Sequence, residues 1–414
     1  MARLQWKEAE DEYKNGVEIA EERLNKLTKE DQRQRWTKET GDVYRGLAEV
    51  FLAEKRNQEA IQLLEFHRYR PFARETIAYA KSSGPRWPEI EKTVLAQPLP
   101  PASGTRLVYV SARNHLYIFT IGGESIKIAV LNEKRDDLER RIYRYVQKCS
   151  MAQTETAPLP VPDAESKDLF SRLLQPVVAQ LRAPETIVID PDIVMKGLPL
   201  EALKSPEGWY FGEKFPIIYS PGYLRENDLR KSSQQAPRWG LLVDALGGAV
   251  SEGAKLHDSF PEIQLVDRPD LKPAELRDLL APSEIFHFVG HGKLGALLLA
   301  NGTSMKASDF PPESLRHLQV AVLAACSTGL TSEGLGDSSS LVRAFQAGGT
   351  PTVIASQWDV DSRATRQLMG RFYTHLRNDE PAVLALFEAK KELIRGQTYK
   401  HPYYWASFIL SGRA

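Results

Sequence analysis

The chain contains Ile285-Phe286-His287-Phe288-Val289-Gly290-His291-Gly292, a run of mostly apolar residues that ends on a histidine between two glycines. A second run, Val320-Ala321-Val322-Leu323-Ala324-Ala325-Cys326, ends on a cysteine and continues into Ser327-Thr328-Gly329. Each run has the length and composition of a buried β-strand, and the carboxyl ends of parallel strands meet at one edge of a sheet. The sequence therefore predicts that a histidine and a cysteine lie together at such an edge.

Other segments around these two runs alternate between strand and helix patterns. The predicted strands, besides the two runs, are 107–110, 116–119, 186–189, 217–219, 240–243 and 352–355, and the main predicted helices are 137–148, 169–181 and 363–376. Short, fully apolar strands that alternate with helices are typical of an α/β fold. We expect an α/β/α sandwich with a mostly parallel sheet that is covered on both faces.

The N-terminal part has a different pattern. Residues 5–93 are rich in charged residues and alanine, with apolar residues at helical spacing. The order of bulky, small and turn residues over 44–71 resembles one tetratricopeptide repeat, although an irregular helical bundle would give a similar pattern. The proline-rich stretch 97–104 cannot continue a helix. We expect a helical region at 1–96, a linker at 97–104 and an α/β domain at 105–414, with halves at 105–235 and 236–414.

Composition excludes several classes of protein. Lys and Arg together number 54, as do Asp and Glu, so that overall charge gives no reason to expect a nucleic acid or an acidic membrane as partner. Two cysteines are too few for a disulfide framework or a four-thiolate zinc site, and they fit a reducing cytoplasm. The sequence has no apolar signal core and no run long enough to cross a membrane. We predict a cytoplasmic protein that needs no metal or cofactor.

The predicted pairing of His291 with Cys326 indicates nucleophilic catalysis. The imidazole can hold the thiol as a thiolate, which attacks a peptide carbonyl, and can then protonate the leaving amine. The backbone N–H groups of Gly292 and Cys326 are the candidate donors to the oxyanion. The alternative is an inert packing cysteine beside a surface histidine. We assign Cys149 to packing, because it ends the apolar stripe of the predicted helix 137–148.

The sequence resembles the CHAT family of caspase-like, separase-related cysteine peptidases, which often carry tetratricopeptide repeats. The likeness covers about 105–414 and rests on ordered segments: 287–292, 324–329, 341–349, 356–361, 368–373 and 401–408. One extra residue before Gly329 distinguishes the cysteine segment from the caspase signature Gln-Ala-Cys-x-Gly. The resemblance implies a caspase-like fold, a His291/Cys326 dyad and a role in bacterial defence or regulated cell death.

The segment Trp358-Asp359-Val360-Asp361 resembles the separase segment whose acidic side chain receives a basic substrate residue. We therefore expect Asp359 and Asp361 to bind substrate, whereas Asp361 can also cap the helix that follows. The resemblance leaves an apolar substrate residue as the alternative to a basic one, because other members of the family cleave after apolar side chains. A hairpin is predicted within 293–303, where Asn301-Gly302 favours a tight turn, and it could wall the pocket. The loop 331–340, rich in glycine and serine, follows the cysteine segment.

The leading prediction is a cysteine endopeptidase that acts on protein substrates. Its N-terminal helical region would recruit a protein partner or receive a protein or ligand activator. A noncatalytic interaction or scaffold protein with the same fold is one alternative. A nucleotide-binding protein is another, suggested by Gly247-Gly248 after a predicted strand, although the pair lacks the Gly-x-Gly-x-x-Gly order.

Overall fold

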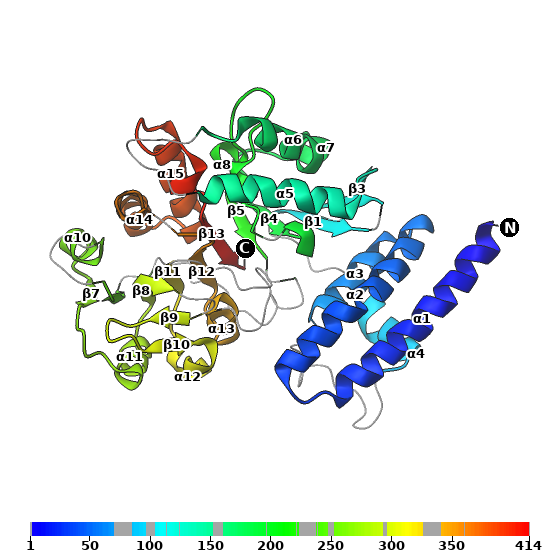
Figure 1. The fold of residues 1–414 in the computed structure, drawn as a ribbon, viewed down its shortest axis with the longest axis horizontal. Coiled ribbons are helices and arrows are strands. Elements are labelled where there is room, and N and C mark those ends of the chain that lie inside the picture. Colours follow the sequence, from blue (N-terminus) through cyan, green and yellow to red (C-terminus); the bar gives the residue numbers. More distant parts are fainter. Residues whose placement is uncertain are drawn as a thin grey trace. The chain divides into compact units, whose positions relative to one another are not determined.

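The computed structural model describes residues 2–413 except for 70–84, 97–103, 113, 124, 152–159, 196, 221, 223–236, 238, 247–251, 293–295, 326–340 and 360. The chain forms two compact units, the first comprising Met1–Pro101 with Gly222–Asn227 and the second comprising Ala102–Pro221 with Asp228–Ala414. The first unit is helical and the second is a mixed α/β unit (Figure 1).

The N-terminal unit is built from long helices that pack on their neighbours along the chain. These are α1 (Ala2–Lys26), α2 (Glu30–Ala53) and α3 (Asn57–Tyr69), followed by the short α4 (Trp87–Ile90) and a π-turn at Glu91–Leu95. Lys55 adopts a φ of 63°, and the N–H of Arg56 donates to the carbonyl of Phe51 at 2.8 Å. This left-handed residue ends α2 and turns the chain into α3, giving the tetratricopeptide-like helix hairpin that the sequence indicates.

Only some of the apolar residues at helical spacing in α1 lie in the core of this unit. Val17 is fully buried, whereas Trp6 and Tyr13 are 41% and 37% exposed. A Cβ atom on Gly46 would lie 2.3 Å from the Tyr13 ring, so that glycine is what allows α1 and α2 to approach closely there. The small residue at this position of the repeat-like pattern is therefore explained by the close packing of two helices.

The second unit contains one large sheet within the described residues. Its strands are β1 (Thr105–Ser111), β2 (Leu116–Gly122), β3 (Ser125–Leu131), β4 (Ile187–Asp190), β5 (Ile217–Tyr219), β6 (Gly240–Asp244), β7 (Ile263–Val266), β8 (Ile285–Gly292), β9 (Ala296–Leu298), β10 (Ser304–Lys306), β11 (Val320–Ala325), β12 (Thr352–Ser356) and β13 (Phe408–Gly412). The main path runs β8-β11-β12-β13-β5-β4-β1-β2-β3, with β6 and then β7 beyond β8. The strand pairs β7–β6, β6–β8, β8–β11 and β11–β12 are all parallel, which confirms the predicted fold class.

Helices cover both faces of the sheet, as predicted. On one face lie α11 (Pro273–Leu280), α12 (Pro312–Leu315) and α13 (Leu341–Ala347). On the other lie α5 (Arg135–Ser150), α6 (Asp163–Leu173), α10 (Glu252–Ser259), α14 (Ser362–Arg377) and α15 (Ala382–Arg395), with the short α7 (Gln175–Val178) and α8 (Phe211–Lys214) (Figure 1). No helix among those described combines the length and the hydrophobicity that a membrane crossing requires.

One predicted helix was wrong in its extent. A single helix was predicted over 169–181, but α6 begins at Asp163 and ends at Leu173, and the short α7 follows. Leu174 departs from regular helical geometry with a φ of −117°. Pro176 has no N–H to continue the hydrogen bonds of α6, so the chain breaks there and starts a new turn.

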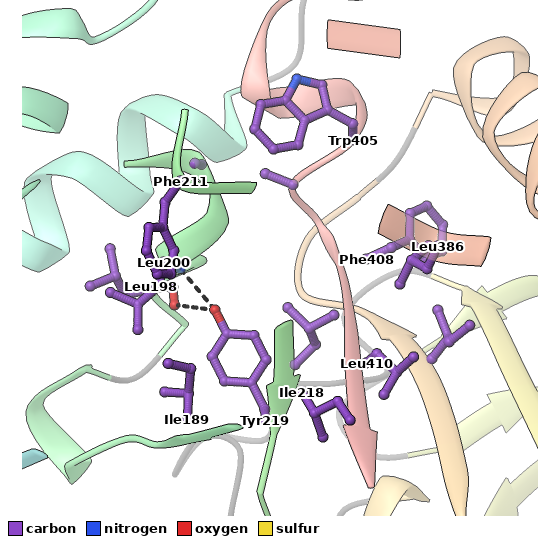
Figure 2. Packing of buried hydrophobic residues seen from close by; sticks show 14 of the residues in the cluster. Ile189, Leu198, Leu200, Phe211, Ile218, Tyr219, Leu386, Trp405, Phe408 and Leu410 are labelled. Atoms are coloured by element: carbon purple, nitrogen blue, oxygen red, sulfur yellow. Dashed lines mark hydrogen bonds between the residues drawn. The ribbon is translucent and has the colours of Figure 1, made fainter. Parts of the chain in front are cut away.

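Strand β13 joins the two halves of the sheet and was missed by the sequence analysis. It pairs antiparallel with β12 from Ser356↔Phe408 to Thr352↔Gly412, and it pairs parallel with β5 through Ser411↔Tyr219. Figure 2 shows Tyr219 on β5 with its hydroxyl bonded to the backbone of Leu198 and Leu200, and it shows Phe408 and Leu410 on the neighbouring β13. The last strand of the chain thus fills the centre of the sheet and carries core residues on both sides.

Candidate active site

His291 lies near the carboxyl end of β8, where the strand leaves the core. Phe286 and Phe288 are fully buried, whereas His291 is exposed. The strand is bounded by β6 and β11, and β9 pairs with its last residues through His291↔Leu298 and Gly292↔Leu297. The imidazole is therefore presented to solvent from a backbone that neighbouring strands hold in place.

The cysteine run begins on the neighbouring strand. β8 and β11 are parallel, in a register that runs from Ile285↔Val320 to Gly290↔Ala325. Gly290 and Ala325 form the last pair of this register. Gly290 directly precedes His291, and Ala325 directly precedes Cys326. Cys326 itself lies outside the described residues.

The buried part of β8 shows which face of the sheet His291 belongs to. Alternate side chains of a strand share a face, so His291 lies on the same face as His287. His287 is fully buried, and its Nδ1 is 2.9 Å from the hydroxyl oxygen of Tyr373 on α14. On β11 this face carries Val322 and Ala324. The candidate site thus lies at the end of the α14-covered face, and His287 is engaged with Tyr373 in the core.

Strand β12 contributes a contact that the sequence analysis missed. Ser356, its last residue, is fully buried, and its hydroxyl donates a hydrogen bond to the carbonyl oxygen of Ala325. The main-chain pairing of β11 with β12 runs from Val320↔Thr352 to Leu323↔Ala355. A side chain thus supplies a bond beyond the end of that ladder. The two residues are 31 positions apart, and no sequence pattern marks a buried serine as a partner of that carbonyl.

The two predicted specificity residues have different surroundings. Asp359 is exposed. Asp361 is half-buried, and its Oδ1 accepts a hydrogen bond of 2.8 Å from the N–H of Ala364, which caps α14. The turn that carries both is anchored by Trp358, whose indole N–H donates to the carbonyl of Tyr403 at 3.1 Å. The structure thus shows the capping role of Asp361 and leaves the carboxylate of Asp359 facing solvent.

The second cysteine is part of the core. Cys149 is fully buried on α5 beside Leu138, Ile142 and Tyr145, the stripe that the sequence analysis assigned to packing. Burial raises the pKa of its thiol to about 12, because the thiolate would lose its hydration. Cys149 is therefore protonated and unreactive at neutral pH.

The hairpin after His291 is present, slightly later in the chain than predicted. β9 and β10 are antiparallel and flank the turn at Asn301 and Gly302, where Gly302 adopts a φ of 79°. The side-chain oxygen of Asn301 accepts from the N–H of Thr303 at 2.9 Å. The predicted glycine pair Gly247-Gly248 and the loop 331–340 lie outside the described residues.

Comparisons with known proteins identify the fold and the family of this chain. The structure resembles chains of two crystal structures of the Saccharomyces cerevisiae separase–securin complex, at 3.0 and 2.6 Å resolution. The TM-scores are 0.60 and 0.59 at 10% and 9% identity, covering 94% and 93% of this chain but 38% and 37% of those chains. At this identity the likeness concerns the fold alone, which is similar to that of the separase chains.

Sequence similarity to curated proteins is more local. The chain is 38% identical over 73 residues to human tetratricopeptide repeat protein 28, and 35% identical over 83 residues to its mouse counterpart. These matches cover 18% and 20% of this chain and 3% of each relative, so the chain spans a small part of their length. The model of the CHAT domain matches residues 163–413, more than half of the chain. This protein therefore belongs to the CHAT domain family.

Proposed function

We propose that this protein is a cysteine endopeptidase that cleaves protein substrates through His291 and Cys326. The observation that carries the proposal is the register Gly290↔Ala325 between parallel neighbours. If the register continued by one residue, Cys326 would lie beside His291 on strands that are about 4.8 Å apart. Alternation would then set both side chains on the face of Val322 and Ala324, within reach of one another.

The dyad would act by acyl transfer. The imidazole of His291 takes the thiol proton, and the sulfur of Cys326 attacks the carbonyl carbon of the scissile peptide bond. When the C–N bond breaks, the imidazolium returns the proton to the leaving amine and a thioester remains on the sulfur. Water, deprotonated by His291, then attacks the thioester, which releases the acid and restores the thiol. The exposure of His291 allows a bulky substrate such as a protein loop to reach this site.

The proposed oxyanion donors are the backbone N–H groups of Gly292 and Cys326. The carbonyl of Val289 accepts from the N–H of Ala245 at 2.8 Å, so that Val289 directs its polar backbone groups toward β6. Because these directions alternate along a strand, the N–H of Gly292 is expected to face β11. A carbonyl oxygen held between the ends of β8 and β11 would then meet a donor from each strand.

The exposed carboxylate of Asp359 supports a preference for a basic residue before the cleaved bond. A charge-assisted hydrogen bond to arginine or lysine would hold the substrate at the turn between β12 and α14. Asp361 adds negative charge at the same turn while it caps the helix. These two residues are the proposed specificity determinants.

The helical N-terminal unit would recruit a protein partner or receive an activator. The similar yeast structures are of a separase–securin complex, in which that peptidase is seen with a partner protein. The resemblance to the CHAT family supports a function in defence or regulated cell death. A reducing compartment such as the cytoplasm suits a catalytic thiol.

The decisive experiment compares the protein with Cys326→Ala. Each is incubated with cell lysate and with candidate activators, and new protein N-termini are sequenced. We expect new termini with the wild type and none with Cys326→Ala. Cys149→Ala is the matched control, because the other cysteine is buried and protonated, and it should retain the activity.

Covalent labelling tests the nucleophile directly. A peptidyl chloromethyl ketone should modify Cys326 and leave Cys149 free, as peptide mapping by mass spectrometry would show. Equal sets of termini from the wild type and Cys326→Ala, together with no labelling of Cys326, would show a noncatalytic CHAT-fold protein instead.

A further inference from the structure

We infer that β3 is a dimerisation strand, through which two copies of this chain join their sheets edge to edge. The inference concerns assembly, so it goes beyond the proposed function and does not depend on it. β3 is the last strand at one end of the sheet, and within the described residues it pairs with β2 alone (Figure 1). Its other edge is therefore open to a further strand.

The pairing with β2 shows which backbone groups of β3 lie on the open edge. Two residues join the strands between Gly122 and Ser125, and a turn of that length is closed by a pair that exchanges backbone hydrogen bonds. Bonded and non-bonded pairs then alternate along the ladder, so Ser125 and every second residue after it bond to β2. The residues between them direct their N–H and C=O groups outward: Ile126, Ile128 and Val130.

This edge lacks most of the features that keep edge strands from pairing. β3 has seven residues, pairs with β2 without a bulge and contains no proline. Its three outward-bonding residues are all apolar, and Val130 is 58% exposed. The one charged residue, Lys127, belongs to the set whose backbone bonds to β2. A long, regular and apolar edge of this kind readily adds another strand.

The edge is self-complementary, which favours a second copy of the chain as its partner. In an antiparallel pair with the two-fold axis at Ile128, that residue faces its own counterpart, and Ile126 of each copy faces Val130 of the other. All outward N–H and C=O groups of both strands are then hydrogen-bonded, and each of these facing pairs is apolar. Lys127 faces Ala129 of the other copy, so no like charges lie directly opposite one another.

The other edge strands of the described sheet match β3 less well. β7, at the opposite end, has four residues and β10 has three, against seven in β3. Pairing of β3 with β7 would leave an edge of each kind free and would continue into a filament, whereas pairing of β3 with β3 closes the assembly at two copies. One strand pair makes a small interface, so we expect a weak dimer that dissociates in the micromolar range.

The experiment measures the mass of the full chain by sedimentation equilibrium from about 1 to about 200 μM, the range in which a small interface associates. Val130→Pro removes an outward N–H but no hydrogen bond to β2. Val130→Thr is the matched control, because it keeps both the N–H and the branched side chain. Thermal unfolding of dilute samples establishes that each variant is folded. Hydrogen exchange at residue resolution follows the amides of β3 at low and high concentration.

We expect the wild type and Val130→Thr to dimerise alike, and Val130→Pro to associate about 10- to 100-fold more weakly, because one hydrogen bond is lost in each copy. With rising concentration the amides of Ile126, Ile128 and Val130 should gain protection from exchange. The amides of the alternate residues should be protected at every concentration, since they bond to β2.

The residue at the two-fold axis tests the register of the pair. Ile128→Lys and Ile128→Glu should each be monomeric, because like charges would face one another, whereas an equal mixture of the two should form heterodimers. Variants of Ile128 that dimerise alone as well as the wild type would contradict this register.

A chain that stays monomeric over the whole range contradicts the inference and leaves the edge to a different protein. A dimer that Val130→Pro leaves intact, with no gain of protection in β3, contradicts it as well. Cleavage of peptides by the wild type, or its absence, bears on the proposed function alone.

Discussion

Asp359 and Asp361 are close in sequence, yet the structure gives them separate surroundings. The carboxylate of Asp361 accepts the N–H of Ala364 and starts α14, so its position is determined by the helix. Asp359 is exposed at the turn before it. Asparagine at either position removes the charge, and at 361 it also keeps an oxygen able to cap the helix. The two roles can therefore be separated by the same substitution at two sites.

Asp359→Asn should reduce kcat/KM for substrates with arginine before the cleaved bond by about tenfold, with little change for leucine, because a charge-assisted contact is lost. The comparison uses paired peptide substrates that differ only at that residue. Asp361→Asn is the control and should give a smaller loss with unchanged thermal stability. An equal loss on arginine and leucine substrates after Asp359→Asn would remove Asp359 from the specificity site.

Helix α3 carries a histidine whose protonation opposes folding of the N-terminal unit. The Nε2 atom of His67 is 2.9 Å from the carbonyl oxygen of Thr37 on α2, and its ring lies 4.2 Å from that of Tyr44. Burial lowers the pKa of His67 to about 4 from a usual value near 6.5. In the unfolded chain the ring takes up a proton as pH falls below about 6.5, whereas in the folded chain it does so only near pH 4. Stability is therefore lost over this interval as the medium becomes acidic.

His67→Gln should make the helical unit less sensitive to acid. Glutamine can still donate to the Thr37 carbonyl, but it does not titrate. Between pH 7.5 and 5.0 the wild type should lose about 2 kcal/mol more unfolding free energy than the variant. Urea unfolding followed by circular dichroism at both pH values gives this difference. Parallel curves for the two proteins across the interval would show that the His67 ring is not kept neutral by folding.

A buried ion pair links distant parts of the α/β unit. The ammonium of Lys390 on α15 lies 2.7 Å from Oε1 of Glu201, in the segment between β4 and β5, although the two are 189 residues apart. The hydroxyl of Tyr219 donates to the other oxygen of Glu201 at 2.6 Å. Burial and the nearby carboxylate raise the pKa of Tyr219, so it remains a donor. The pair thus connects the first half of the sheet with the last long helix.

Lys390→Met should destabilise the α/β unit by about 3–5 kcal/mol, because Glu201 is left buried without its cation. The double variant Glu201→Gln, Lys390→Met should recover much of this loss. Lys391→Met is the matched control: its partner Glu388 lies on the same helix near the surface, and the expected cost is about 0–1 kcal/mol. Denaturant unfolding of all three variants is the measurement. If Lys390→Met costs no more than Lys391→Met, the pair does not hold the two halves together.

At the scale of the whole molecule, sequence patterns predicted the strands that are apolar throughout. β8, β11 and β12 were expected because unbroken runs of buried residues suit a parallel sheet covered on both faces. The pattern failed for β3, whose residues are all exposed or half-buried, and for β13, whose run Phe408-Ile409-Leu410 gives no information about its partners. A strand's place in a sheet depends on pairings with distant segments, which local composition does not encode.

The sequence by itself determined the class of fold and named His291 and Cys326, since strand-forming runs and reactive side chains are properties of short segments. Only the tertiary structure decided that β13 joins the two halves, that Asp361 caps α14 and that Ser356 bonds the carbonyl of Ala325. Each of these depends on atoms that folding brings within hydrogen-bond distance. Hydrogen bonds act over about 3 Å in space, whatever the separation of the residues along the chain.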